Sequence, residues 1–137
     1  MLPVNIFLAL FALISLPIRT QTLLWAHNTT SCVASTVILS DDAAFVPTYG
    51  GHFLSLSRSN GQVLWRNVDV GGQNSPVLLF GTIYFPSESG VLYALNKDTG
   101  KAVWSSGGHI IYNNVRPAIA MVNNMYVVFV GGADKRT

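Results

Sequence analysis

The sequence has 137 residues, about the length of one domain. Half of them are hydrophobic, 10% are charged, and the formal net charge is +2. The 11% aromatic content excludes an intrinsically disordered chain. The few Lys and Arg residues are scattered, which excludes a basic stripe for nucleic acid. The single cysteine, Cys32, excludes an internal disulfide and cannot by itself form a zinc site.

Residues 1–20 are predicted to be a secretory signal peptide, and residues 21–137 the folded part. The apolar core Ile6–Leu16 is shorter than the roughly 20 residues that span a bilayer and fits the h-region of a signal. An uncleaved membrane anchor and a buried strand or helix stay open, because no Lys or Arg precedes the core. A signal predicts secretion, an endoplasmic-reticulum lumen or a periplasm. In a eukaryotic host, the Asn-Thr-Thr sequence at Asn28 would accept a glycan.

A period of about 39 residues organises the rest of the chain. The three tryptophans, Trp25, Trp65 and Trp104, are 40 and 39 residues apart, and Ala44–Trp65 aligns with Ile83–Trp104 without a gap. A period of this length is typical of repeat architectures. The matched pairs are Pro47 with Pro86, Gly51 with Gly90, Leu56 with Leu95, and Gly61 with Gly100.

Each repeat is predicted to form four short strands, because its segments are rich in Val, Ile, Tyr and Phe and are separated by turn residues. In chain order, the predicted strands are Thr22–Trp25 as the outer strand of a preceding unit, then Thr36–Leu39, Ala43–Pro47, His52–Leu56, Gln62–Arg66, Pro76–Leu79, Thr82–Pro86, Val91–Leu95 and Lys101–Ser105. A third, partial unit covers Arg116–Ala118 and Met125–Gly131. Four strands in about 40 residues make one β-propeller blade. The expected fold is all-β, with two complete blades and partial flanking ones.

One turn of the second repeat carries a specific motif. Its pattern residues are Ala94, Asn96, Thr99, Gly100, Lys101 and Trp104. Asn96 has the side chain to accept hydrogen bonds from the amides of the turn, and Gly100 suits the positive φ that ends such a turn. The first repeat keeps Gly61 and Trp65 of this pattern.

This stretch resembles the A-x-D-x-x-T-G-K-x-x-W repeat of pyrroloquinoline-quinone-type (quinoprotein-like) β-propellers, with Asn96 in place of Asp. The resemblance covers residues 22 to about 132. It implies that each indole docks on the neighbouring blade, so that Trp65 and Trp104 are core residues. It also implies a ring of seven or eight blades, of which this sequence would be a fragment with open edges that favour association.

The resemblance leaves more than one function open, because this fold hosts several. The first is a non-enzymatic scaffold that binds a protein partner or the remaining blades, without nucleic acid, and contacts a membrane only through an uncleaved N-terminal segment. The second is the N-terminal part of a PQQ-dependent dehydrogenase, in which blades outside this sequence would supply quinone and calcium sites. A lectin-like repeat has poor support, because Tyr49 and Tyr112 do not recur at the repeat spacing. We expect no catalytic, cofactor or metal residue within the chain.

Other polar residues have structural interpretations. His27, His52 and His109 do not recur at the repeat spacing, and none is grouped as a metal ligand. The Asp41–Asp42 pair is predicted to form the turn between two strands, with a cation site as the alternative. Gly71–Gly72 and Gly107–Gly108 are expected at the crossovers between blades, and Cys32 is expected to be a buried or capped thiol.

Overall fold

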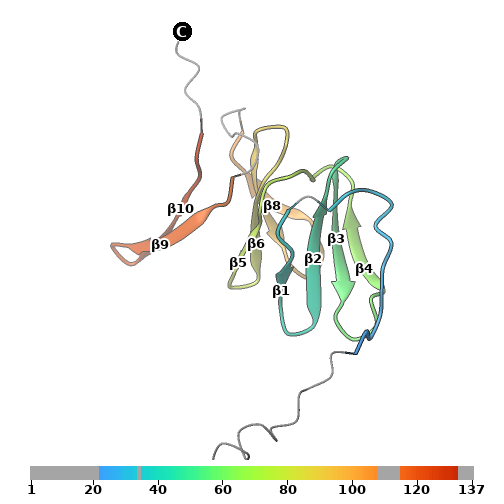
Figure 1. Cartoon of the computed structure of the whole chain (residues 1–137). Coiled ribbons are helices and arrows are strands. Elements are labelled where there is room, and N and C mark those ends of the chain that lie inside the picture. Colours follow the sequence, from blue (N-terminus) through green and yellow to red (C-terminus); the bar gives the residue numbers. More distant parts are fainter. Residues whose placement is uncertain (1–21, 34, 108–114, 133–137) are drawn as a thin grey trace, which may run out of the picture.

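A computed structural model gives the structure of residues 22–33, 35–107 and 115–132. The predicted signal peptide lies outside these residues. The described chain is all-β and contains two four-stranded antiparallel sheets and one hairpin (Figure 1). The first sheet consists of β1 (Ile38–Leu39), β2 (Ala43–Thr48), β3 (His52–Ser57) and β4 (Val63–Asn67). The second consists of β5 (Val77–Leu79), β6 (Thr82–Pro86), β7 (Leu92–Asn96) and β8 (Ala102–Ser105), and the hairpin of β9 (Ala118–Val122) and β10 (Met125–Phe129).

In both sheets the strand order follows the chain order, which is the up-and-down topology of a propeller blade. The prediction of two complete blades and part of a third is confirmed, and most strand ends agree within one or two residues. Both sheets have a register shift at equivalent positions, between Ser55 and Leu56 and between Ala94 and Leu95. The 39-residue repeat is therefore also a repeat of backbone geometry.

Two predicted strands differ from the structure. Thr22–Trp25 is not a strand, because an extended segment forms one only by pairing with another backbone, and no described residue pairs with it. The predicted strand at Thr36 begins only at Ile38. Ser35 and Thr36 instead bond to the segment that precedes β5: the Ser35 hydroxyl donates to the Asn74 carbonyl at 2.5 Å, and the Thr36 and Ser75 hydroxyls are 3.0 Å apart.

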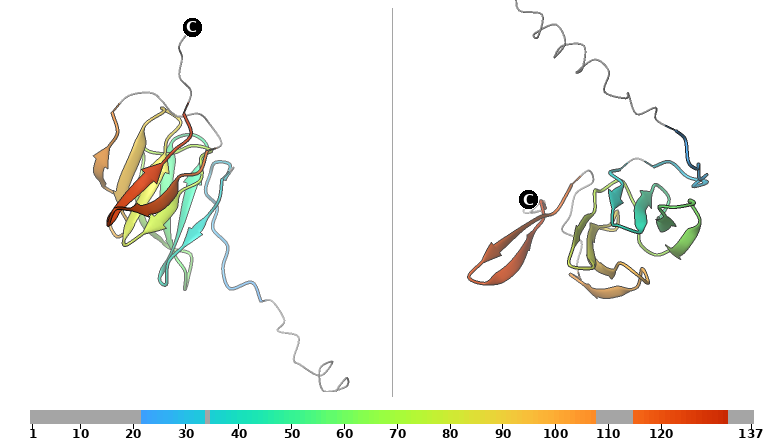
Figure 2. Two further views of the ribbon diagram at one scale, coloured as in Figure 1. Left: turned by 90° about the vertical axis from the view of Figure 1, so that its left-hand side faces the viewer. Right: turned by 90° about the horizontal axis from the view of Figure 1, so that it is seen from below.

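The main hydrophobic core lies between the two sheets. Phe45 and Phe53 of the first sheet pack with Phe85 and Leu95 of the second, and all four are almost fully buried. The Phe53 and Phe85 rings meet edge to face, with centroids 4.9 Å apart. The middle strands are buried on both faces, which explains the low charge of the sequence. Seen from below, the sheets and the hairpin follow one another as separate layers (Figure 2).

The crossover between the two sheets is close-packed at Gly71 and Gly72. A Cβ atom on Gly71 would lie 2.4 Å from the backbone of Gly51 and His52, and one on Gly72 would lie 2.3 Å from the Glu88 side chain. The Gly72 amide donates to the Thr48 carbonyl at 3.0 Å. These glycines let two backbones meet, and the prediction of a crossover here is confirmed.

No helix with the length and apolar character needed to cross a membrane occurs in the described residues.

Candidate functional site

The turn between β7 and β8 is built around Asn96. Its side-chain oxygen accepts hydrogen bonds from the backbone amides of Asp98 (2.9 Å) and Thr99 (3.0 Å) and from the Thr99 hydroxyl (3.2 Å). Gly100 ends the turn at a φ of +68°, a left-handed conformation that glycine adopts without steric cost. Lys101 is exposed, and its amide lies 3.4 Å from the Thr99 hydroxyl. The structure thus has the turn that the sequence predicts.

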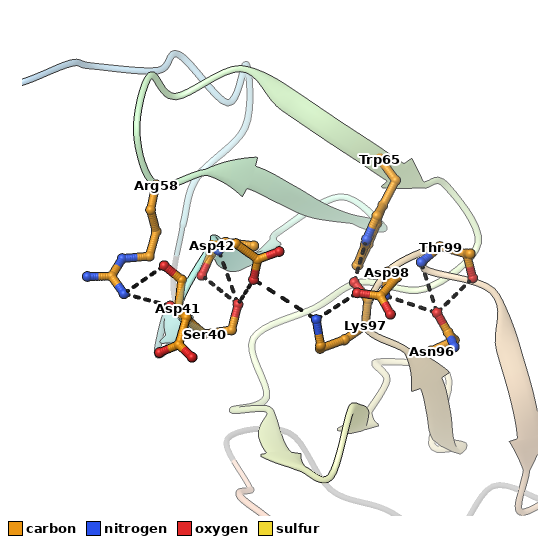
Figure 3. Close-up of polar contacts among 10 residues, drawn as sticks. Ser40, Asp41, Asp42, Arg58, Trp65, Asn96, Lys97, Asp98 and Thr99 are labelled. Atoms are coloured by element: carbon orange, nitrogen blue, oxygen red, sulfur yellow. Dashed lines mark hydrogen bonds and ion pairs between the residues drawn. The ribbon is translucent and has the colours of Figure 1, made fainter.

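Trp65 of the first sheet docks on this turn of the second sheet. Its indole N–H donates to the Lys97 carbonyl at 2.8 Å, and its ring covers Gly100 so closely that a Cβ atom there would lie 2.4 Å from Cε3. The neighbouring Asn67 amide donates to the Gly100 carbonyl at 2.8 Å. The contact joins the sheets through one ring face, one N–H group and one glycine, and Figure 3 shows the Trp65 indole pointing at this turn.

Trp25 makes an equivalent contact on the turn of the first sheet. Its indole N–H donates to the Arg58 carbonyl at 2.8 Å, and a Cβ atom on Gly61 would lie 2.5 Å from its Cε3. The same ring also packs against Leu54 and Leu56. A residue outside any described strand therefore fills the place that Trp65 fills one repeat later.

Trp104 does not dock, and the prediction of a core role for it is wrong in the described structure. The residue is 44% exposed, and its aromatic contact is with Tyr84 of its own sheet, with ring centroids 6.2 Å apart. The indole lies next to Ala94, its ladder partner.

Charged side chains of the two sheets meet at these turns (Figure 3). Asp42 lies in the turn between β1 and β2, and its Oδ1 is 4.0 Å from the Lys97 ammonium, which is 2.6 Å from Asp98 Oδ1. Hydrogen bonding by Ser40 and by its own backbone, together with Lys97, lowers the pKa of Asp42. The hydrogen bond to Asp98 raises the pKa of Lys97. The prediction of a turn at Asp41–Asp42 is confirmed.

These charges border a groove of about 280 Å³ between the sheets. It continues into a second hollow of about 510 Å³, with which it shares Asp42 and Leu64. The first hollow is lined by Asp42, Ala43, Phe45, Ser55, Leu64, Trp65, Lys97 and Asp98. Besides the two shared residues, the second hollow is lined by Asp41, Ser57, Arg58 and Ser59. The groove is apolar at its base and charged at its rim.

Ser55 is a feature that the sequence analysis did not identify as a site. The residue is fully buried, and its hydroxyl has no hydrogen-bond partner among the residues that the structure describes. It lies between Phe45 and Trp65 in the sheet ladder. The available signal was the repeat alignment, in which Ser55 stands where the second repeat has Ala94.

The remaining candidate residues form no second site in the part of the chain that the structure describes. Cys32 is exposed, contrary to the prediction of a buried or capped thiol. Asn28 is exposed, and its side chain accepts a hydrogen bond from the Thr30 amide. His109 lies outside the described residues. Within the described ranges, no three His, Cys, Asp or Glu side chains gather as metal ligands.

The sheet topology and the repeated Trp–Gly docking define a β-propeller of the PQQ-repeat type. The family model described as outer membrane protein assembly factor BamB matches residues 12–135. The chain therefore belongs to this family.

Two curated relatives are outer membrane protein assembly factors BamB. The protein from Legionella pneumophila (strain Paris) is 36% identical over 72 residues, 53% of this chain and 18% of that protein. The protein from Yersinia pestis is 28% identical over 99 residues, 72% of this chain and 24% of that protein. The chain thus matches a quarter or less of the length of these relatives.

Solved structures agree with the fold. BamB from Moraxella catarrhalis superimposes with a TM-score of 0.59 at 26% identity, over 64% of this chain and 28% of that one. The quinohemoprotein alcohol dehydrogenase ADHIIG from Pseudomonas putida HK5 superimposes with a TM-score of 0.58 at 20% identity, over 81% of this chain and 19% of that one. The second likeness concerns the fold alone.

Proposed function

We propose that the chain contributes blades to a non-enzymatic propeller that serves as a protein-interaction scaffold in outer-membrane protein assembly. The observation that carries this proposal is the family match over residues 12–135, together with relatives named as assembly factors. These relatives come from bacteria, which favours the periplasm over an endoplasmic-reticulum lumen or secretion from a eukaryotic cell. The proposed role needs neither quinone nor calcium.

The geometry supports a scaffold because its specific contacts serve packing. Trp25 and Trp65 both bind a turn glycine and a backbone carbonyl of a neighbouring unit. Asp41, Asp42 and Asp98 lie at a rim that also holds Arg58 and Lys97, and no metal-ligand set occurs in the described residues. Rigid blades with open loops suit the presentation of a surface to another protein.

Deletion of the gene in its own organism tests the proposal. We expect less folded outer-membrane β-barrel protein, measured as the heat-modifiable band on gels, and restoration by the intact gene. An unchanged outer membrane, together with loss of a dye-linked, quinone-dependent alcohol or sugar oxidation, would support the dehydrogenase alternative instead. An unchanged outer membrane without that loss would also contradict the scaffold proposal.

A further inference from the structure

The groove between the two sheets has more open hydrogen-bond acceptors than open donors. The Arg58 guanidinium already donates to the carbonyls of Ser40 (2.7 Å) and Asp41 (3.3 Å). The Lys97 ammonium is held at 2.6 Å by Asp98. Each carboxylate, in contrast, offers about four acceptor sites. Asp41, Asp42 and Asp98, half of the six acidic residues of the chain, border the groove and leave most of these sites open.

The buried hydroxyl of Ser55 is an independent sign of a ligand. It lines the same groove, it is fully buried, and no described group bonds to it. A buried polar group without a hydrogen-bond partner destabilises the folded chain. The second repeat avoids this cost with Ala94 at the equivalent position. A bound group that reaches Ser55 would satisfy the hydroxyl.

We propose that this groove binds the guanidinium group of an arginine side chain presented by a partner polypeptide. The inference rests on the proposed scaffold function, because it names the chemistry of a partner. A guanidinium has five donors in a planar fork and pairs with carboxylates in a bidentate manner. Its head would donate to Asp42, Asp98 and the Ser55 hydroxyl, while its aliphatic stem would lie against Ala43 and Leu64.

Competing chemistries fit the groove less well. A carboxylate would meet the rim carboxylates, of which Asp42 is kept ionised by its lowered pKa. A neutral carboxamide has two donors and no charge. An ammonium has three donors but lacks the planar fork. Lys97 opposes any cation, but its ammonium is already drawn toward Asp98.

Nuclear magnetic resonance of the ¹⁵N-labelled 137-residue chain provides the test. Trp65 lines the groove, whereas Trp25 and Trp104 do not, so the three indole N–H signals contain a reporter and two references. The probe is arginine blocked as N-acetyl-arginine amide. We expect a saturable shift of the Trp65 signal, a weaker response to the blocked lysine amide and none to the blocked glutamine amide. Equal shifts for arginine and glutamine would overturn the proposal.

Variants locate the binding. Asp42→Asn combined with Asp98→Asn should weaken binding of the probe about tenfold, because two charge-assisted contacts are lost. Ser55→Ala should weaken it severalfold. Asp69→Asn, an exposed carboxylate outside the groove, is the matched control and should leave binding unchanged. Unchanged Trp25 signals show that the variants fold, and full binding by the double variant would refute the groove as the site.

The same probe separates this inference from the proposed function. Binding of the blocked arginine that depends on Asp42 and Asp98 supports the groove even if deletion of the gene leaves the outer membrane unchanged. An outer-membrane defect on deletion, together with no shift of the Trp65 signal on addition of blocked arginine, supports the scaffold and refutes the arginine site.

Discussion

Gly100 shows how much a single residue of a repeat can be predicted. The motif predicts a turn glycine, and the structure has it at a positive φ. The motif does not predict that the Trp65 ring covers the same atom, since a contact between sheets is not contained in local turn chemistry. The sequence resemblance supplied the idea of docking, and the distances show which glycine receives which ring.

We predict that Gly100→Ala destabilises the chain more than Gly81→Ala. Both residues have a positive φ, +68° and +76°, which costs an alanine about 1 kcal/mol. Only at position 100 would the new Cβ atom collide with the Trp65 ring, whereas nothing lies within 4 Å of it at position 81. The collision adds about 1–3 kcal/mol. Urea unfolding measures both variants, and equal losses would contradict the docking contact.

Ser55 is the residue that sequence reasoning left without a role. The alignment shows that it differs from Ala94, but burial and the lack of a partner emerge only from the three-dimensional packing. A serine in a strand of alternating polarity is compatible with an exposed position. The strand is instead buried on both faces by the neighbouring sheet and by Trp25.

Replacement of Ser55 by alanine is expected to stabilise the unliganded chain. Removing a buried hydroxyl without a partner should raise the free energy of unfolding by about 1 kcal/mol. Ser57→Ala is the control, because that hydroxyl pairs with Ser59 at 2.9 Å at the surface and its loss should change stability by less than about 0.5 kcal/mol. Thermal melting of both variants decides the matter, and a loss of stability in Ser55→Ala would reveal a bond that the structure does not contain.

At the scale of the strands, local composition predicts most of the architecture. The middle strands are bounded by Gly, Asn and Asp turns, and their predicted limits nearly coincide with those of β2, β3, β6 and β7. The outer parts are less predictable, because pairing depends on what lies beside them. Thr22–Trp25 has the composition of a strand and pairs with no described strand, while the side chains of Ser35 and Thr36 bond to the segment that precedes β5.

Trp65 and Trp104 are predicted to contribute different amounts to the free energy of unfolding. Trp65→Ala removes ring contacts with Phe45 and Phe53 and the bond to the Lys97 carbonyl, which should cost about 3–5 kcal/mol. Trp104→Ala removes a ring that is 44% exposed and should cost about 1 kcal/mol. Chemical denaturation of the two variants provides the comparison. Comparable losses would indicate a Trp104 partner outside the described residues.

At the scale of the molecule, the hairpin is the least covered part. Met121, Met125 and Phe129 are each more than half exposed. Phe80 of the second sheet reaches the hairpin through Tyr126, with ring centroids 5.1 Å apart. Two strands alone are marginally stable in water, and unpaired strand edges recruit other strands. Within the described ranges, β9 and β10 pair only with each other, so the hairpin has both an apolar face and strand edges for association.

The isolated 137-residue chain is accordingly expected to self-associate. Light scattering should show a mass that rises with concentration. Met125→Lys should lower this tendency, because it places a charge on the hairpin face, whereas Val68→Lys adds the same charge to an exposed loop position and should not. A compact monomer at all concentrations, with cooperative melting, would contradict the expectation.

The bonds between equivalent positions of neighbouring units have a consequence for the gene. Ser35 bonds to Asn74 and Thr36 to Ser75, each pair being 39 residues apart, and the two docked indoles each meet the glycine of the following unit. Every such bond connects one unit to the next copy of itself. Recombination that adds or removes 39 codons in frame would therefore recreate the junction it cuts, so that blade number is open to change in a single genetic event while substitutions at the junction stay constrained.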